Sequence, residues 1–341
     1  MKKVYFLACV VAALMAAALT FAAAQASACS AIPEATFSID TISGLTAAEI
    51  NTSVTGGTVN ATGCDIGVYF SPGKTGVVRN ATVFGAQKAG IVNNGARVTI
   101  DSNAVYQIGD TPLDGVQYGL AIYVYGQGSS LASGDVTNNT VWSFQKNGIT
   151  VHGPNARSDV LNNTVIGEGP VDYIAQNGIE VGYGATTNVL NNTVFGMSYT
   201  GPNEASSAGV LLFGGPFFDF LFPNSPVQAN SVVQGNNLSG NDIGVALANY
   251  DSAGTGSQNT PTKNVVVGNT LRDNGIFNTT GDVTVGYQAG VQIVGKDDLV
   301  FGNSICGIGY TPATAPPATA NIFSVDATIA ITPIVFGNGC F

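Results

Sequence analysis

The chain has 341 residues, of which only 9% are charged, and it contains 44 glycines together with many Asn, Thr and Ser residues. This composition excludes a charged, disordered chain. It also excludes a mainly helical protein, because helices need charged or Ala/Leu-rich faces toward solvent. The formal net charge of −10 disfavours nucleic acid and anionic lipid headgroups as partners, because like charges repel one another.

The first 28 residues have the pattern of an export signal. Lys2 and Lys3 precede an apolar run over residues 4–24, and residues 26–28 (ASA) match the small-x-small pattern that signal peptidase cuts. We therefore expect a secreted, periplasmic or cell-surface protein whose mature chain is residues 29–341. The alternative is a retained membrane anchor, because the apolar run is about long enough to span a bilayer. Cleavage would leave nine basic and 21 acidic residues, a net charge of −12.

Two kinds of anchor residue alternate along the chain. The first is an Asn that precedes a small or Thr residue and then an apolar one. The second is a Gly that begins an apolar segment of three to six residues, rich in Val and Ile and alternating with period two, which predicts a strand. The Asn anchors are Asn60, Asn80, Asn103, Asn139, Asn163, Asn192, Asn237, Asn269 and Asn303, and the Gly anchors are Gly67, Gly90, Gly119, Gly148, Gly178, Gly209, Gly244 and Gly290.

The spacing of these anchors predicts a solenoid. The shortest Asn-to-Gly step is 7 residues and the shortest Gly-to-Asn step is 13, so a minimal coil has 20 residues and no room for a crossover helix. The strands should therefore stack in parallel, one coil on the next, in one all-β domain. The variable repeat length excludes the strict six-residue rhythm of a hexapeptide coil and the regular frame of a leucine-rich repeat.

The N-N-T-V segment at residues 162–165 and the N-G-I-x-V segment at residues 177–181 resemble the repeats of the right-handed parallel β-helix proteins, the pectate-lyase-like group. The resemblance covers about residues 55–310. It implies a single-stranded right-handed parallel β-helix of about eight to ten coils. The anchor asparagines would then stack about 4.8 Å apart at one corner as an Asn ladder. The alternative for six of the Asn-x-Ser/Thr sequences is N-glycosylation.

The same resemblance does not identify an enzyme family. Polygalacturonase-like members carry Asn-Thr-Asp and Arg-x-Lys motifs that this chain lacks, and the acid and arginine motif of the pectate lyases is not matched around Arg97 or Arg157. If the chain is an enzyme, the resemblance implies a polysaccharide lyase or a glycoside hydrolase.

The ends of a solenoid need caps, because an open coil exposes a strand edge. Thr46-Ala47-Ala48-Glu49 has the spacing of a capping box and predicts a short helix over the first coil. The four cysteines after the signal predict two disulfides. They lie in two groups about 38 Å apart, whereas disulfide partners need α-carbons within about 7 Å. Unless the tails fold back along the solenoid, we expect the local pairs Cys29–Cys64 and Cys306–Cys340; Cys29 also permits lipidation as an alternative.

The outward face of the Gly-anchored strands carries the candidate catalytic residues. Residues one and three after the Gly are nearly all Val, Ile or Leu and should face the core, so those two and four after it face outward. This rule places Tyr123, His152 and Glu180 on consecutive coils, with Tyr125 and Tyr183 just beyond. Aromatic rings that stack on sugars, together with a His and a carboxylate that move protons, predict a polysaccharide site. The alternative is a solvated His beside an unrelated Glu.

The inserted corners collect carboxylates on one edge of the predicted solenoid. Because clustered carboxylates hold Ca²⁺, this rim is a candidate calcium site, and a solvated acidic rim is the alternative. The residues are Asp110, Asp114, Glu168, Asp172 and Glu204.

A Phe-rich insert follows Gly209. If it is exposed, it forms a patch that would contact a protein, lipid or glycan partner; if it is folded under its own loop, it is a satellite core. Its members are Phe213, Phe217, Phe218, Phe220, Leu221 and Phe222. We therefore expect a protein that binds or processes a polysaccharide on its outward face, or, as the alternative, a non-catalytic surface or adhesive protein that uses the insert.

Overall fold

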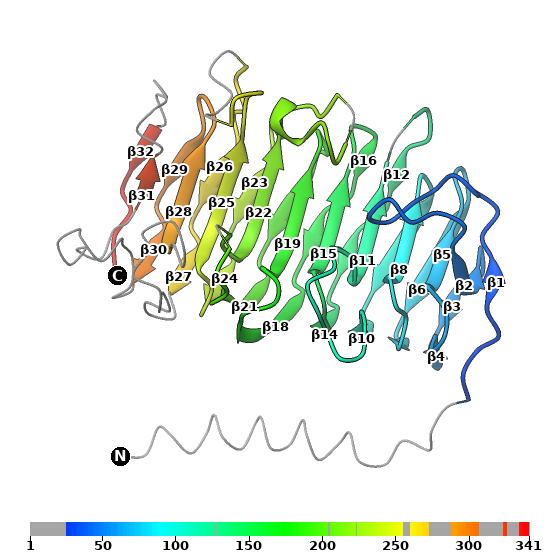
Figure 1. Ribbon diagram of the computed structural model, residues 1–341. Helices are drawn as coiled ribbons and strands as arrows, with labels where there is room; N and C mark the ends of the chain where they lie inside the picture. Colours follow the sequence, from blue (N-terminus) through cyan, green and yellow to red (C-terminus); the bar gives the residue numbers. More distant parts are fainter. Residues whose placement is uncertain are drawn as a thin grey trace, which may run out of the picture.

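A computed structural model describes residues 25–126, 128–203, 205–222, 224–254, 260–272, 288–306, 323–325 and 334–340 of the chain (Figure 1). Residues 1–24 of the expected signal peptide, and Glu204 of the acidic rim, lie outside these ranges. Across the described ranges, the one helical element is the 3₁₀ turn η2 (Pro216–Phe218), and no helix is long and apolar enough to cross a membrane.

The described strands form three sheets, whose strands follow one another along the solenoid axis (Figure 1). The first sheet contains β1 (Ser30–Ala31), β2 (Thr46–Ile50), β5 (Ile66–Phe70), β8 (Ala89–Asn94), β11 (Leu120–Tyr125), β15 (Asn147–His152), β19 (Asn177–Gly182), β22 (Ala208–Gly214), β25 (Ile243–Asn249), β28 (Ala289–Val294) and β31 (Phe323–Val325). The second contains β4 (Thr58–Asn60), β7 (Thr82–Phe84), β10 (Ala104–Ile108), β14 (Thr140–Phe144), β18 (Thr164–Val171), β21 (Thr193–Tyr199), β24 (Asn237–Ser239), β27 (Thr270–Arg272) and β30 (Ser304–Cys306).

The third sheet contains β3 (Val54–Thr55), β6 (Thr75–Arg79), β9 (Arg97–Asp101), β12 (Ala132–Ser133), β13 (Val136–Thr137), β16 (Ala156–Arg157), β17 (Val160–Leu161), β20 (Asn188–Leu190), β23 (Val232–Gln234), β26 (Val265–Val267), β29 (Leu299–Phe301) and β32 (Ile334–Phe336). Apart from the antiparallel pair of β1 and β2, the paired strands of the three sheets are parallel, for example β15 beside β19. The chain is therefore an all-β parallel β-helix, as the spacing of the anchors predicted.

The interior between the sheets is a continuous apolar core. Each Gly-anchored strand except β11 contributes the residue directly after its Gly, such as Ile149 and Ile179, and these side chains are fully buried. In β11, Ile122 lies beside Ile149 and is buried in the same core. Because the period-two pattern places every other side chain of a strand on one face, the opposite residues of the same strands face away from this core.

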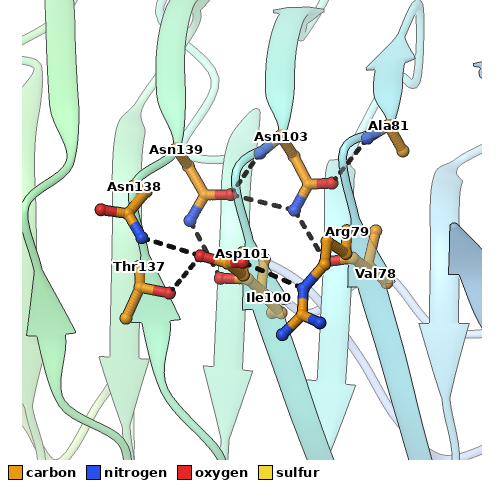
Figure 2. Close-up of polar contacts among 9 residues, drawn as sticks. All are labelled: Val78, Arg79, Ala81, Ile100, Asp101, Asn103, Thr137, Asn138 and Asn139. Atoms are coloured by element: carbon orange, nitrogen blue, oxygen red, sulfur yellow. Dashed lines mark hydrogen bonds and ion pairs between the residues drawn. The ribbon is translucent and has the colours of Figure 1, made fainter. Parts of the chain in front are cut away.

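An Asn ladder runs along one corner of the β-helix, and its step from Asn103 to Asn139 is drawn in Figure 2. Asn103 Nδ2 donates to Asn139 Oδ1 at 2.9 Å, and Asn139 Nδ2 donates to Asn163 Oδ1 at 2.9 Å. Each amide nitrogen also donates to a backbone carbonyl, that of Val78 for Asn103. The ladder therefore satisfies polar groups that are buried, as a stacked corner requires. It continues through Asn192, Asn236, Asn269, Asn303 and Asn338.

Three of the predicted anchors are wrong as ladder members. Asn80 has a left-handed φ of 51°, and the next residue, Ala81, occupies the ladder position. Asn237 pairs with Thr193 in the neighbouring strand, so the ladder residue of this coil is Asn236. Asn60 Oδ1 instead accepts hydrogen bonds from the backbone and side chain of Thr62, within its own turn.

At the ends of the described β-helix, the disulfides agree with the prediction and the capping helix does not. The disulfides are the predicted local pairs, Cys29–Cys64 and Cys306–Cys340, with Cα–Cα distances of 5.4 and 4.9 Å. The predicted capping helix is wrong, because Thr46–Ile50 is strand β2. Its Ala47 pairs with Ile66 of β5, and Thr46 Oγ1 donates to Asp65 Oδ2 at 2.9 Å. Strand pairing with the first coil therefore outweighs the helical spacing.

Candidate functional site

The predicted pair of His152 and Glu180 is brought together on the outward face of the first sheet. His152 Nε2 lies 2.9 Å from Glu180 Oε1, and the two side chains are only 12% and 7% exposed. The pair is diagonal across neighbouring strands, since Glu180 of β19 lies directly beside Thr150 of β15, two residues before His152. The contact is close, but its geometry does not meet that of a well-directed hydrogen bond.

Residues at paired positions on neighbouring strands form rows across the first sheet. The rows in which Tyr123 and Tyr125 lie differ from the prediction. Tyr123 pairs with Thr150 and therefore shares the row of Glu180, while Tyr125 pairs with His152. The anchor rule fails here because Gly119, with φ of 85°, lies in the preceding corner. Leu120 therefore pairs with Asn147, so the strand is shifted by two residues relative to the predicted register. A shift by an even number keeps Tyr123 and Tyr125 on the outward face.

Glu180 is held as a carboxylate by its neighbours. Its Oε2 accepts a hydrogen bond from Asn177 Nδ2 at 2.8 Å, and Asn177 Nδ2 also lies 3.2 Å from Asn147 Oδ1. Burial raises the pKa of Glu180, but the contacts with His152, the charge of Lys146 and the hydrogen bond from Asn177 more than offset this and hold the pKa below its ordinary value. Glu180 is thus an oriented, ionised acceptor at neutral pH.

The imidazole of His152 is oriented by aromatic rings. Its ring centroid lies 4.8 Å from that of Tyr183, 5.5 Å from that of Phe213 and 5.7 Å from that of Tyr123, and all three contacts are T-shaped or edge-on. Gly182 lies between His152 and Phe213 in the same row. A Cβ atom there would lie 2.5 Å from Phe213 Cε1 and 3.2 Å from His152 Cδ2, so the glycine makes room for both rings.

The candidate site is a cleft of about 400 Å³ on the outward face of the first sheet. One wall comes from the N-terminal segment, which crosses the first sheet (dark blue in Figure 1) and packs Phe37 against Tyr69, Tyr123 and Tyr125. The cleft is lined by Ser38, Ile39, Asp40, Thr41, Gln117, Leu120, Tyr123, Tyr125, Lys146, Asn147, His152, Asn177, Glu180, Tyr183, Leu211, Phe213, Phe218, Leu221, Phe222 and Ala248. Its polar floor and aromatic walls suit a ligand with both polar and apolar faces.

The second wall is the Phe-rich insert. One part of it is a satellite core and the other an exposed patch, so each predicted alternative holds for part of the insert. Phe213 and Phe222 are buried, and the ring of Phe222 stacks on Tyr183 with centroids 4.6 Å apart. In contrast, Phe217, Phe220 and Leu221 are 44%, 73% and 54% exposed. The base of the insert is therefore a satellite core that closes the cleft, and its tip is an exposed apolar patch.

Several residues of the cleft were not predicted from the sequence. Lys146 donates from Nζ to the carbonyl of Ala175 at 2.8 Å. Burial lowers the pKa of Lys146, an effect partly offset by the charges of Glu180 and Asp40. Asn147 and Asn177 directly precede Gly anchors, and this Asn-Gly pairing was the available signal for them. Asp40 comes from the N-terminal segment, which lacks the repeat and so gave no signal.

The described residues of the acidic rim do not come together as a metal site. Asp110 Oδ2 accepts from the Tyr118 hydroxyl at 2.6 Å, and its Oδ1 accepts from Gln87 at 2.7 Å. Asp114 Oδ1 accepts from the backbone of Val116 within its own loop. Within the part of the chain that the structure describes, no three His, Cys, Asp or Glu residues form a group that could hold a metal ion. Glu168 and Asp172, the other described rim residues, belong to no such group.

The fold and the site define a parallel β-helix protein with an aromatic cleft around a His–Glu pair. No protein-family model matches the chain. No curated protein sequence matches it either. Among solved structures it is similar to DFA-IIIase from Arthrobacter chlorophenolicus A6, with 12% sequence identity and a TM-score of 0.41, over 79% of this chain. The chain spans 57% of the length of DFA-IIIase.

Proposed function

We propose that the chain is an exported protein that binds a saccharide in the cleft, and that His152 and Glu180 transfer a proton to or from the bound sugar. The observation that carries this proposal is the ionised Glu180 held 2.9 Å from His152 inside a cleft with aromatic walls. The two disulfides support export, because disulfides persist in oxidising compartments.

The lining of the cleft matches the two faces of a sugar ring. Sugar C–H faces pack on aromatic rings, and Tyr123, Tyr125 and Tyr183 line the cleft around His152. Sugar hydroxyls need donors and acceptors, which Asn147, Asn177 and Glu180 would supply at the floor. A cleft of about 400 Å³ holds a short stretch of a glycan rather than a long chain along an open groove.

The contact between His152 and Glu180 favours one proton arrangement. Because Nε2 is the imidazole nitrogen next to the carboxylate, the proton belongs on Nε2 and the lone pair on Nδ1. His152 would then accept a proton at Nδ1 from a water or a sugar hydroxyl, and Glu180 would stabilise the resulting imidazolium. The same proton can return to a leaving oxygen.

A glycan panel tests the proposal. The purified protein would be incubated with pectins, alginates and neutral glycans, with and without calcium, and assayed for binding, new reducing ends and unsaturated ends. Glu180→Gln and His152→Gln should lower processing by about 10²-fold or more, whereas Glu168→Gln, at an exposed carboxylate, should leave it unchanged. Failure to bind or cleave any member of the panel would overturn the proposal.

The exposed tip of the Phe-rich insert favours a second candidate, a non-catalytic adhesive function. Phe217 and Phe220 are exposed, and their replacement by Ser should leave the buried base of the insert intact. If these two changes abolish binding to a partner while His152→Ala and Glu180→Ala alter no measurable activity, the adhesive function is correct and the catalytic one is wrong.

A further inference from the structure

A two-residue turn of the N-terminal segment projects into the cleft. The backbone N–H of Ile39 donates to the carbonyl of Ile42 at 3.1 Å, and that of Ile42 donates to the carbonyl of Ile39 at 3.0 Å. Between them, Asp40 and Thr41 form the tip, and both are exposed and line the cleft. The tip therefore offers a carboxylate and a hydroxyl to a bound ligand from the N-terminal wall.

The backbone of this tip is held in a conformation that its residues disfavour. Asp40 and Thr41 have φ of 48° and 66°, the left-handed region that Asn-Gly pairs favour in such turns. For Thr41, which is β-branched, this is an outlier. The turn is kept in place by the buried side chains of Phe37, Ile39 and Leu45. A disfavoured residue that persists at the edge of a cleft points to a use for its side chain.

The charges around the cleft indicate what kind of sugar it accepts. Asp40 and Glu180 both line it, and among the described lining residues Lys146 is the only lysine or arginine. Lys146 donates to the carbonyl of Ala175 and is attracted by both carboxylates. An added carboxylate on the ligand would meet two negative charges for one positive charge, whereas a neutral polyol would offer hydroxyl donors to them.

We propose that Asp40 and Thr41 determine specificity by binding hydroxyl groups of a neutral saccharide from the wall formed by the N-terminal segment. The carboxylate of Asp40 accepts hydrogen bonds from two adjacent sugar hydroxyls, and the Thr41 hydroxyl contributes one further donor or acceptor. This inference rests on the proposed saccharide-binding function of the same cleft.

Calorimetric titration with matched oligosaccharides of one length, one neutral and one built of uronic acids, tests the inference. The unmodified chain should bind the neutral ligand at least about ten-fold more tightly than the uronic one. Asp40→Asn should weaken neutral binding by about ten-fold and reduce the discrimination. Thr41→Gly should weaken binding several-fold while thermal stability stays equal or rises, because glycine relieves the left-handed φ. Asp135→Asn, at an exposed carboxylate of the third sheet's corner, is the control and should change nothing.

The outcomes separate this inference from the proposed function. If the neutral ligand binds and Glu180→Gln alters that binding, but Asp40→Asn and Thr41→Gly behave like Asp135→Asn, the specificity role is wrong and the proposed function stands. Equal or tighter binding of the uronic ligand by the unmodified chain also overturns the inference. Absence of binding to either ligand overturns the inference, and the wider glycan panel then decides the proposed function.

Discussion

Asn163 makes the same two contacts to Asn192 that every step of the ladder makes to the next. Its side-chain Nδ2 lies 3.0 Å from Asn192 Oδ1, and its backbone N–H donates to that same oxygen at 2.8 Å. A second acceptor for Nδ2 is the carbonyl of Val136, at 2.9 Å. One amide thus joins three coils, and its loss leaves buried polar groups of its neighbours without partners.

Replacement of Asn163 by Ala should therefore destabilise the fold. We expect a loss of about 2–4 kcal/mol in the free energy of unfolding, because several buried donors and acceptors lose one partner each. The adjacent Asn162 is the matched control. It is exposed and has φ of 57°, so Asn162→Gly should change stability by less than about 0.5 kcal/mol. Urea unfolding measures both, and equal losses for the two variants would contradict the ladder's role.

The repeat made the fold predictable because its two anchors recur at every coil. Once the ladder is known, the pattern also shows why Asn236, and not the predicted Asn237, is the ladder residue of its coil. The ladder residue stands two before the apolar residue, as Asn163 does before Val165, and Asn236 has that position before Leu238. The sequence alone did not distinguish the two neighbouring asparagines, because both can precede a strand.

The site was predictable only where it lies on the repeat. His152 and Glu180 occupy outward positions of consecutive repeats, so their proximity follows from strand alternation. The cover over them does not. Phe37 and Asp40 belong to a segment without any repeat, and Phe222 belongs to an insert. Contacts between such segments and the strands depend on tertiary packing, which no local period encodes.

Asp298 should give the fold an unusual dependence on pH. Its side chain is fully buried, and Oδ1 accepts from Thr262 Oγ1 and from the backbone of Asn264, both at 2.7 Å. Oδ2 has no hydrogen-bond partner among the described residues. Burial raises the pKa of Asp298 to about 6, although the hydrogen bonds from Thr262 and Asn264 act in the opposite direction.

The sign of this effect follows from proton binding. Between the unfolded pKa of about 3.9 and the folded pKa of about 6, the folded chain holds a proton that the unfolded chain has released. The contribution of Asp298 to stability therefore falls as pH rises through this window, by about 3 kcal/mol in total. Asp298→Asn removes the ionisation, so the variant should gain stability relative to the unmodified chain between pH 4 and pH 8. Thermal unfolding at both pH values measures it, and a constant difference would contradict the prediction.

Gly182 should be intolerant of even one added carbon. An Ala Cβ would lie 2.5 Å from Phe213 Cε1, and Phe213 is held by contacts with Tyr183 and Phe218. We expect Gly182→Ala to destabilise the chain by about 1–3 kcal/mol and to displace His152 from Glu180, which would lower saccharide processing. The double variant Gly182→Ala with Phe213→Leu, which frees space, should recover part of both losses. Unchanged activity in the single variant would show that His152, Gly182 and Phe213 are packed less tightly than this prediction requires.

The two disulfides should differ in their effect on the cleft, although both close loops of similar length. Cys29–Cys64 fixes the start of the N-terminal segment that forms one wall, while Cys306–Cys340 lies at the far end of the solenoid (Figure 1). Replacement of either pair by Ser should cost about 3 kcal/mol of stability. Only the change at Cys29 and Cys64 should also weaken saccharide binding, because it releases the segment that carries Asp40. Thermal unfolding and calorimetric titration distinguish the two, and equal binding by both double variants would show that packing of Phe37 alone holds the wall.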